Sequence, residues 1–140
     1  MRGDKLPHNR APKPGAPFYL PTAQYRTAVN YCLSYKDLKR DLHNLNGWHS
    51  HNNDGQPRGA GISDPTATEA IKRVRIEKKI DVIESSVRDV AGRWLYADML
   101  RAVTDENCSY QTLRMSGMPL NKNAFVKMRR EIYWKVYHRM

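Results

Sequence analysis

The chain has 140 residues, of which 24 are lysine or arginine and 14 are aspartate or glutamate, so its formal net charge at pH 7 is +10. This length suits one domain with a tail and excludes a large multidomain enzyme. A hydrophobic fraction of 40% allows a modest core, and no apolar run approaches the roughly 20 residues that span a bilayer. The excess of positive charge favours a polyanionic partner.

Residues 1–17 combine basic side chains with Pro7, Pro12, Pro14 and Pro17. Proline fixes φ and removes a backbone donor, so this segment is predicted to be a flexible basic arm. The arm is expected either to contact phosphates or merely to solubilise the chain. It has no apolar stretch of the kind found in secretory signals, and we therefore expect an intracellular protein without a membrane-embedded part.

Residues 18–46 are predicted to form an N-terminal helical segment, as one helix or as two short ones. Apolar residues recur there at helical spacings, namely Val29, Cys32, Leu33, Leu38, Leu42 and Leu45. The two cysteines, Cys32 and Cys108, lie far apart and form no Cys-x-x-Cys pair. We therefore expect reduced core cysteines rather than a disulfide scaffold or a structural zinc site.

Residues 47–62 are rich in glycine and asparagine and nearly free of apolar residues. They are predicted to form a long loop, and loops of that length are usually functional or disordered. His49 and His51 lie in this segment, but no carboxylate or thiol stands at a matching spacing. Neither a metal site nor any other cofactor is therefore predicted.

A long central helix is predicted to follow the loop. Ser63–Thr66 is typical of a helix start, and Thr66 and Glu69 have the Thr-x-x-Glu spacing of a capping box. An apolar seam then runs along the helix at alternating spacings of four and three, through Ile76, Ile80, Ile83, Val87, Val90 and Trp94. The seam is predicted to pack inside the protein, and the alternative is a coiled-coil dimer. Gly92 predicts a bend, after which residues 93–104 continue as a helix.

Residues 63–140 are thus predicted to form a helical domain that ends in a helix-turn-helix over residues 109–139. Ser109 is the expected cap of a short first helix, Gly117 supplies the turn, and Asn121 caps the second helix. The core candidates of the short helix are Tyr110, Leu113 and Met115. Because no strand-like alternation of useful length occurs, the predicted fold class is all-α: a helical N-terminal part, a long central helix and a C-terminal helix-turn-helix.

The second helix of this unit is predicted to have an apolar face and an opposite basic face. The apolar face consists of Phe125, Met128, Ile132 and Val136. The candidate DNA-binding residues are Asn121, Lys122, Asn123, Lys127, Arg129, Arg130 and Lys135, and Arg139 widens the same basic surface. Amides and cations at the start of a helix suit base edges and phosphates. The alternative is an ordinary amphipathic helix with a solvated basic face, and the aromatic run Tyr133, Trp134 and Tyr137 is expected to pack rather than to stack on bases.

Two stretches of the chain resemble a known family. The segment DGQPRGAGISDPTATEAIKR (54–73), preceded by YKDLKRDL (35–42), is similar to the RinA/ArpU-type transcriptional regulators of phages and prophages. The resemblance covers residues 24–139 and implies a C-terminal helix-turn-helix like region 4 of sigma factors. Under it, residues 113–117 take the place of the supporting helix and turn, and residues 121–125 that of the start of the recognition helix.

The chain departs from the family pattern in two places. Asn121 stands where a serine or threonine cap is usual, and residues 88–92 replace an acidic connection that often contains proline. The resemblance implies a protein of the bacterial host cytoplasm that is associated with activation of late or packaging genes.

The leading hypothesis is a phage or prophage transcriptional regulator that binds double-stranded DNA through the helix from Asn121, without catalysis. One alternative is an activator or antiterminator that contacts RNA polymerase, with the helix over 66–87 as its surface. A second is a small terminase-type DNA-packaging subunit. Helix-turn-helix proteins often pair on two half-sites, so a homodimer is one expected state. An enzyme is not predicted, because His-Glu-x-x-His, P-loop and Gly-x-Ser-x-Gly motifs are all missing from the sequence.

Overall fold

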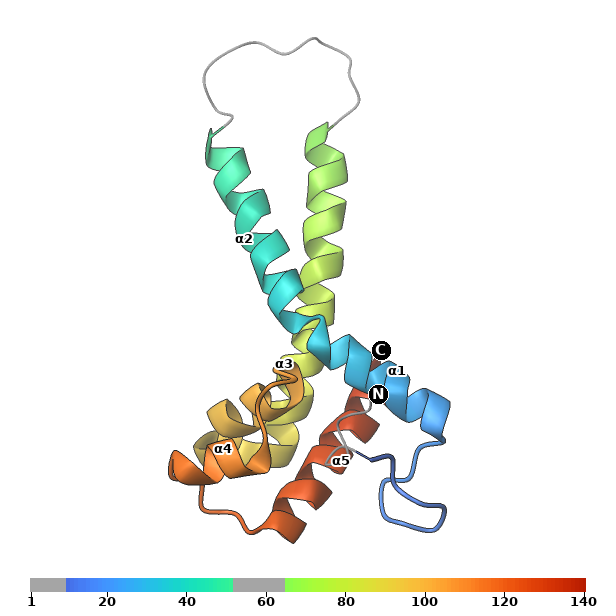
Figure 1. The fold of residues 1–140 in the computed structure, drawn as a ribbon. Helices are drawn as coiled ribbons and strands as arrows, with labels where there is room; N and C mark the ends of the chain where they lie inside the picture. Colours follow the sequence, from blue (N-terminus) through green and yellow to red (C-terminus); the bar gives the residue numbers. More distant parts are fainter. Residues whose placement is uncertain (1–9, 52–64) are drawn as a thin grey trace, which may run out of the picture.

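The computed structural model describes residues 10–51 and 65–140, and within these two ranges it contains helices and turns but no strand (Figure 1). The helices are α1 (Thr22–Leu33), α2 (Tyr35–His51), α3 (Pro65–Thr104), α4 (Tyr110–Met115) and α5 (Lys122–Arg139). The prediction of an all-α fold with a long central helix is confirmed. No helix in the described ranges is both long enough and apolar enough to cross a membrane.

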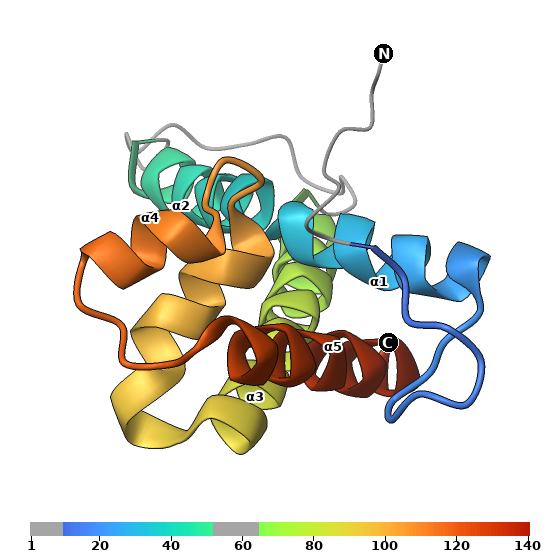
Figure 2. The same ribbon diagram turned by 60° about the horizontal axis from the view of Figure 1, so that its bottom comes forward.

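The helices form a stalk on a base. The stalk consists of α2 and the first part of α3, up to Asp81, and it projects from the rest of the molecule (Figure 1). The base consists of α1, the remainder of α3, α4 and α5. Helix α5 packs against both α1 and α3, and Figure 2 shows it lying across α3. Helix α5 therefore packs within the base, against both α1 and α3.

The N-terminal helical segment divides into two helices at Ser34. The Ser34 hydroxyl donates a hydrogen bond to the Tyr31 carbonyl oxygen at 2.5 Å, and the Ser34 carbonyl accepts from the Leu38 N–H at 2.9 Å. At the root of the stalk the Tyr35 hydroxyl donates to Glu84 of α3 at 2.5 Å. Burial and this contact with a carboxylate raise the pKa of Tyr35 above its usual value. The division at Ser34 thus lets α1 follow the base while α2 follows α3.

Helix α2 continues to His51, five residues beyond the predicted end at Asn46. The predicted loop over 47–62 is therefore wrong for residues 47–51, and its remaining residues lie outside the described ranges. A single glycine at position 47 costs a helix only about 1 kcal/mol relative to alanine. No proline follows until Pro57, so the sequence places no strong helix breaker in this part of α2.

Helix α3 begins at Pro65, within the predicted helix start at Ser63–Thr66. Proline is favoured in the first helical position, where its missing N–H is not needed. The residues immediately before Pro65 lie outside the described ranges. Since Thr66 is already within the helix, it is not the N-terminal cap, and the predicted capping box with Glu69 is wrong.

The predicted bend in α3 is confirmed at Gly92, which has φ 72° and ψ −175°. The seam before it is confirmed as well: Ile76, Ile80, Ile83 and Val87 are buried and Val90 is half-buried. The prediction fails at Trp94, which is 90% exposed. A seam at helical spacing assumes a continuous helix, and the non-helical backbone at Gly92 changes which residues face the core. After the bend, the buried hydrophobic residues of α3 are Met99, Ala102 and Val103.

The hydrophobic core of the base joins α1, α3, α4 and α5. Its largest fully buried side chains include Tyr133, Phe125, Ile83, Met99, Leu113, Ile132, Val87, Val103 and Val136. The ring of Tyr25 on α1 lies edge-on to Tyr133 on α5, with 5.2 Å between the ring centroids. Cys32 and Cys108 are buried free cysteines, as predicted, and burial raises the pKa of both thiols.

The described part of the N-terminal segment, residues 10–21, lies against the base instead of extending from it (Figure 2). Pro12 and Leu20 are buried, and Ala11 packs on the core. Gly15, at φ 89°, allows a turn in which the Ala16 N–H donates to the Lys13 carbonyl at 3.0 Å. The prediction of a flexible arm is therefore wrong for residues 10–17, because Pro12 is buried and Ala11 packs against the core. Residues 1–9 lie outside the described ranges.

Candidate nucleic-acid interface

The short helix α4 and the long helix α5 are joined by a turn that the local sequence specifies. The Gly117 N–H donates to the Arg114 carbonyl at 3.1 Å, and the Met118 N–H donates to the Leu113 carbonyl at 3.0 Å. This pair of bonds is the Schellman motif, in which a residue after the helix takes a positive φ. Gly117 has φ 104°, and Leu113 and Met118, which flank the turn, are both buried in the hydrophobic core.

The N-terminal ends of α4 and α5 are capped by the predicted residues. The Ser109 hydroxyl accepts a hydrogen bond from the Thr112 N–H at 3.2 Å. The Asn121 side-chain oxygen accepts from the Ala124 N–H at 2.8 Å. Each cap satisfies one of the N–H groups that the first turn of a helix leaves free. Asn121 therefore fixes the residue at which α5 begins.

Tyr110 braces the turn between the two helices. Its hydroxyl donates to the Leu120 carbonyl at 2.9 Å, and its ring centroid lies 5.3 Å from that of Phe125. Tyr110 is half-buried and Leu113 is fully buried, so both pack in the hydrophobic core as predicted. The same prediction is wrong for Met115, which is 84% exposed at the last position of α4. Met118, beyond the turn, is buried instead.

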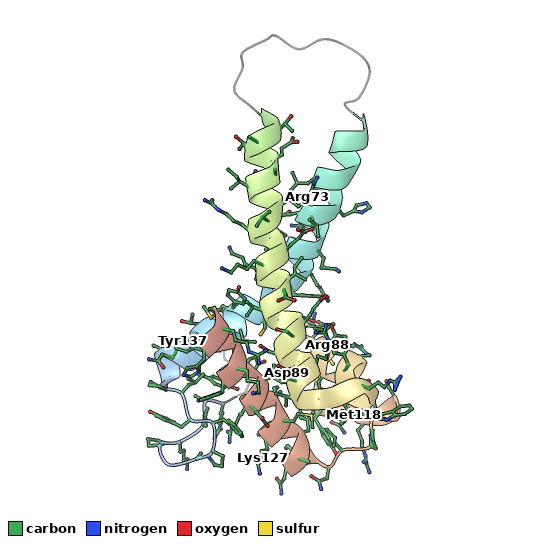
Figure 3. All side chains as sticks on the ribbon, turned by 180° about the vertical axis from the view of Figure 1, so that it is seen from behind. Arg73, Arg88, Asp89, Met118, Lys127 and Tyr137 are labelled. Atoms are coloured by element: carbon green, nitrogen blue, oxygen red, sulfur yellow. The ribbon has the colours of Figure 1, made fainter. Side chains whose placement is uncertain are left out.

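The first turns of α5 present polar and basic side chains to solvent. Asn121, Lys122, Asn123 and Lys127 are all exposed, and Figure 3 shows Lys127 directed away from the base. We call these residues the α5 tip. The tip also has the positive end of the helix dipole, which favours anions. Four of the seven predicted DNA-binding residues are thus exposed together at one end of one helix.

The prediction that Arg129 lies on the basic face of α5 is wrong. It is only 3% exposed, and its guanidinium carbon lies 5.0 Å from the centroid of the Phe125 ring. The buried residues of α5 are Phe125, Arg129, Ile132, Tyr133 and Val136. They occupy two sides of the helix because α5 packs against both α1 and α3. The prediction of one apolar face opposite one basic face is therefore wrong for α5, and Arg129 is not accessible to a duplex.

The remaining predicted cations lie along the more covered part of α5. Arg130 is half-buried and donates to the carbonyl oxygen of Arg10 at 3.3 Å. Lys135 is half-buried, and its charge acts on Asp89 of α3. Neither residue joins the exposed α5 tip.

Arg139 connects the end of α5 to α3. It donates to Asp89 at 2.6 Å and to the Ser85 hydroxyl at 3.2 Å. The hydrogen bond from Arg139 holds the pKa of Asp89 below its usual value. Arg139 is thus committed to an ion pair within the protein.

The aromatic run near the end of α5 packs within the protein, as predicted. Tyr133 is 1% exposed. Trp134 contacts the ring of Phe18 with 5.9 Å between centroids, and it contacts the ring of His138 with 4.2 Å. Sequence reasoning missed the first of these contacts, although the apolar run Phe18-Tyr19-Leu20 directly after the prolines was the available signal.

Among the described residues, no group of three or more histidine, cysteine, aspartate or glutamate side chains could hold a metal ion. The side chains of His49 and His51 lie outside the described part of the structure. Comparison with protein-family models, with curated proteins and with solved structures finds no match for this chain. The geometry of the α5 tip is therefore the basis for assigning a function.

Proposed function

We propose that this protein is a DNA-binding transcriptional regulator of the phage and prophage type, and that it contacts the duplex with the α5 tip. The proposal rests on one observation above all. Asn121, Lys122, Asn123 and Lys127 are exposed together at the N-terminus of α5, which a short helix and a tight turn precede. The net charge of +10 supports a polyanionic partner.

The residue types at the α5 tip suit the major groove of DNA. An asparagine amide can make two hydrogen bonds to the edge of adenine, and a lysine can bind guanine or a phosphate. In helix-turn-helix proteins the N-terminal residues of the second helix reach the base edges. We assign base reading to Asn123 and phosphate binding to Lys127, while the remainder of α5 anchors the tip to α1 and α3.

The docked N-terminal segment adds cations beside α5. Arg10 and Lys13 are exposed, and the Arg10 backbone is bonded to Arg130. Each phosphate that a protein cation neutralises releases counterions, so the affinity of such a surface falls steeply with salt. Both the tip and this segment are expected to contribute to that salt dependence.

The test is a salt-titrated binding assay with a mixed-sequence duplex library and with the DNA that adjoins the coding sequence. Lys127→Ala should weaken binding to all duplexes and lower the salt slope by about one. Asn123→Ala should relax selectivity at one base position, at a cost of roughly 1 to 3 kcal/mol for the preferred base.

Lys78→Ala is the matched control, because it removes one exposed lysine from the stalk. It should bind the duplex nearly as the wild type does. Wild-type affinity, selectivity and salt slope in both tip variants would contradict the proposed use of α5.

A second candidate function has its own observation. Ile71 and Val74, on α3 in the stalk, are 55% and 62% exposed. Neighbouring apolar side chains on a helix are a common feature of protein interfaces. The stalk would then contact RNA polymerase, as in an activator or antiterminator with little DNA selectivity of its own. Capture of polymerase in the absence of DNA, lost in Ile71→Ser, is the result expected for this second function.

A further inference from the structure

The bend of α3 forms an exposed elbow, which we define as Arg88, Arg93, Trp94, Ala97 and Arg101. Trp94 is the most exposed large hydrophobic residue in the described ranges, at 90%. Tryptophan has a large apolar surface and is highly buried on average, so its exposure here is unusual. The bend at Gly92 is what brings it outward, since the seam before the bend is buried.

The surroundings of Trp94 are rich in arginine. Arg88, Arg93, Ala97 and Arg101 are all exposed, and positions 97 and 101 follow Trp94 by three and seven residues, on the same helix face. The three arginines outnumber the acidic residues nearby. Asp89 is bonded to Arg139, and the other acidic residue, Asp98, is half-buried. The elbow therefore has an apolar centre within a positively charged surface.

The elbow lies beside α5. Helix α3 packs against α5, and the ion pair of Arg139 and Asp89 joins the two helices just before the elbow. Arg139 is the last residue of α5, so this pair lies at the opposite end of the helix from the α5 tip. A duplex that receives the α5 tip would extend beyond it, because a base-reading helix covers only part of a turn of DNA.

We propose that the elbow is a second contact with the same DNA duplex. Arg88 and Arg93 bind phosphates that flank the site read by the α5 tip, and Trp94 packs into the adjoining minor groove. This inference rests on the proposed function, because it needs the duplex to lie on the α5 tip. Proteins that contact the minor groove combine arginine side chains with an apolar wedge, and the elbow has both. An acidic protein partner is the competing occupant, but only DNA accounts for the elbow and the tip together.

The first test measures duplex affinity and salt slope for full-length Trp94→Ala. Because the apolar wedge is lost, duplex affinity should fall at least several-fold. The salt slope should stay as in the wild type, since no charge is removed. Arg93→Ala should weaken binding and also lower the slope by about one. Met115→Ala is the control, because Met115 is 84% exposed and lies on α4.

The variants also allow a check that is independent of affinity. Trp94 is exposed, so Trp94→Ala should keep the helical circular dichroism signal and the melting temperature of the wild type. Addition of duplex should protect part of the tryptophan fluorescence of the wild type from iodide quenching. The same addition should produce much less protection in Trp94→Phe.

The outcomes separate the two proposals. If Lys127→Ala weakens binding but Trp94→Ala and Arg93→Ala bind as the wild type does, the elbow inference is overturned and the α5 assignment stands. If none of the three variants changes affinity, both are overturned. If Trp94→Ala leaves duplex affinity intact but abolishes capture of a protein or reduces the mass seen by light scattering, the elbow is a protein interface and the inference is wrong.

Discussion

Arg129 belongs to the most basic stretch of the chain, yet its side chain lies in the core. Its guanidinium lies over the Phe125 ring, and its charge also acts on Tyr25. Burial raises the pKa of Tyr25 to about 12 despite the opposing effect of the Arg129 charge. Tyr25 is therefore neutral at pH 7. Because the aliphatic stem of an arginine packs as an apolar group, the Arg129 side chain can pack in the core.

We expect Arg129→Ala to destabilise the protein by about 2 to 4 kcal/mol, through lost packing and through its effect on the buried groups around it. Lys127→Ala, two positions earlier and exposed, should stay within about 0.5 kcal/mol of the wild type. Urea unfolding followed by circular dichroism measures both. Equal stability of the two variants would contradict the burial of Arg129.

The ion pair of Asp89 and Arg139 predicts a dependence of stability on pH. Because Arg139 lowers the pKa of folded Asp89, this carboxylate stabilises the fold above its unfolded pKa of about 3.9. That contribution is lost as the pH falls through the lower, folded pKa. The effect is expected to be small, since both side chains are substantially exposed. Unfolding free energies of wild type and Asp89→Asn should differ at pH 7, and the difference should shrink as the pH falls below about 4, a pattern that a purely steric effect of the substitution would not give.

At the scale of an element, Gly92 decides the shape of α3. Its φ of 72° with ψ of −175° belongs to a region that is essentially restricted to glycine. No atom lies within 4 Å of the position that a Cβ would occupy, so a substitution there is penalised by backbone conformation and not by crowding. Gly92→Ala should therefore destabilise the protein by about 1 to 3 kcal/mol.

Thermal unfolding of Gly92→Ala compared with Ala97→Gly provides the measurement. Ala97→Gly lies on the same helix beyond the bend and is exposed, so it should cost only about 1 kcal/mol, through helix propensity. A stable Gly92→Ala protein with unchanged melting would mean that α3 tolerates a straight path through this position.

The elements that sequence reasoning located best are those set by local chemistry. Ser109, Gly117 and Asn121 each act through a backbone bond to residues one turn away, so their positions predicted α4, the turn and α5. Arg129 and Trp94 could not be placed in this way. Their exposure depends on which helices pack on α5 and on how the backbone turns at Gly92, and neither fact follows from helical spacing alone.

At the scale of the whole molecule, the stalk and the base differ in how much they bury. Along α3, no side chain from Thr66 to Arg75 is fully buried, whereas Ile83, Ser86 and Val87 near the base are 0% exposed. Local opening is easiest where few apolar contacts are lost. Backbone amides of residues 68–75 should therefore exchange with deuterium much faster than those of residues 83–90. Equal protection along α3 would indicate that the stalk has a partner in solution that covers Ile71 and Val74.

The packing of α5 between α1 and α3 has a consequence for how the chain folds during synthesis. Helix α1 obtains its aromatic contact at Tyr25 from Tyr133 on α5, and Arg10 is bonded to Arg130, 120 positions later. Distant contacts of this kind cannot form until both partners have left the ribosome, and they slow folding relative to local helix pairing. The hairpin of α2 and α3 can assemble early, but the base cannot assemble before α5 is available. Until α5 emerges, α1 and the middle of α3 expose the apolar side chains that the folded protein buries, so the nascent chain is most prone to aggregate before α5 has left the ribosome.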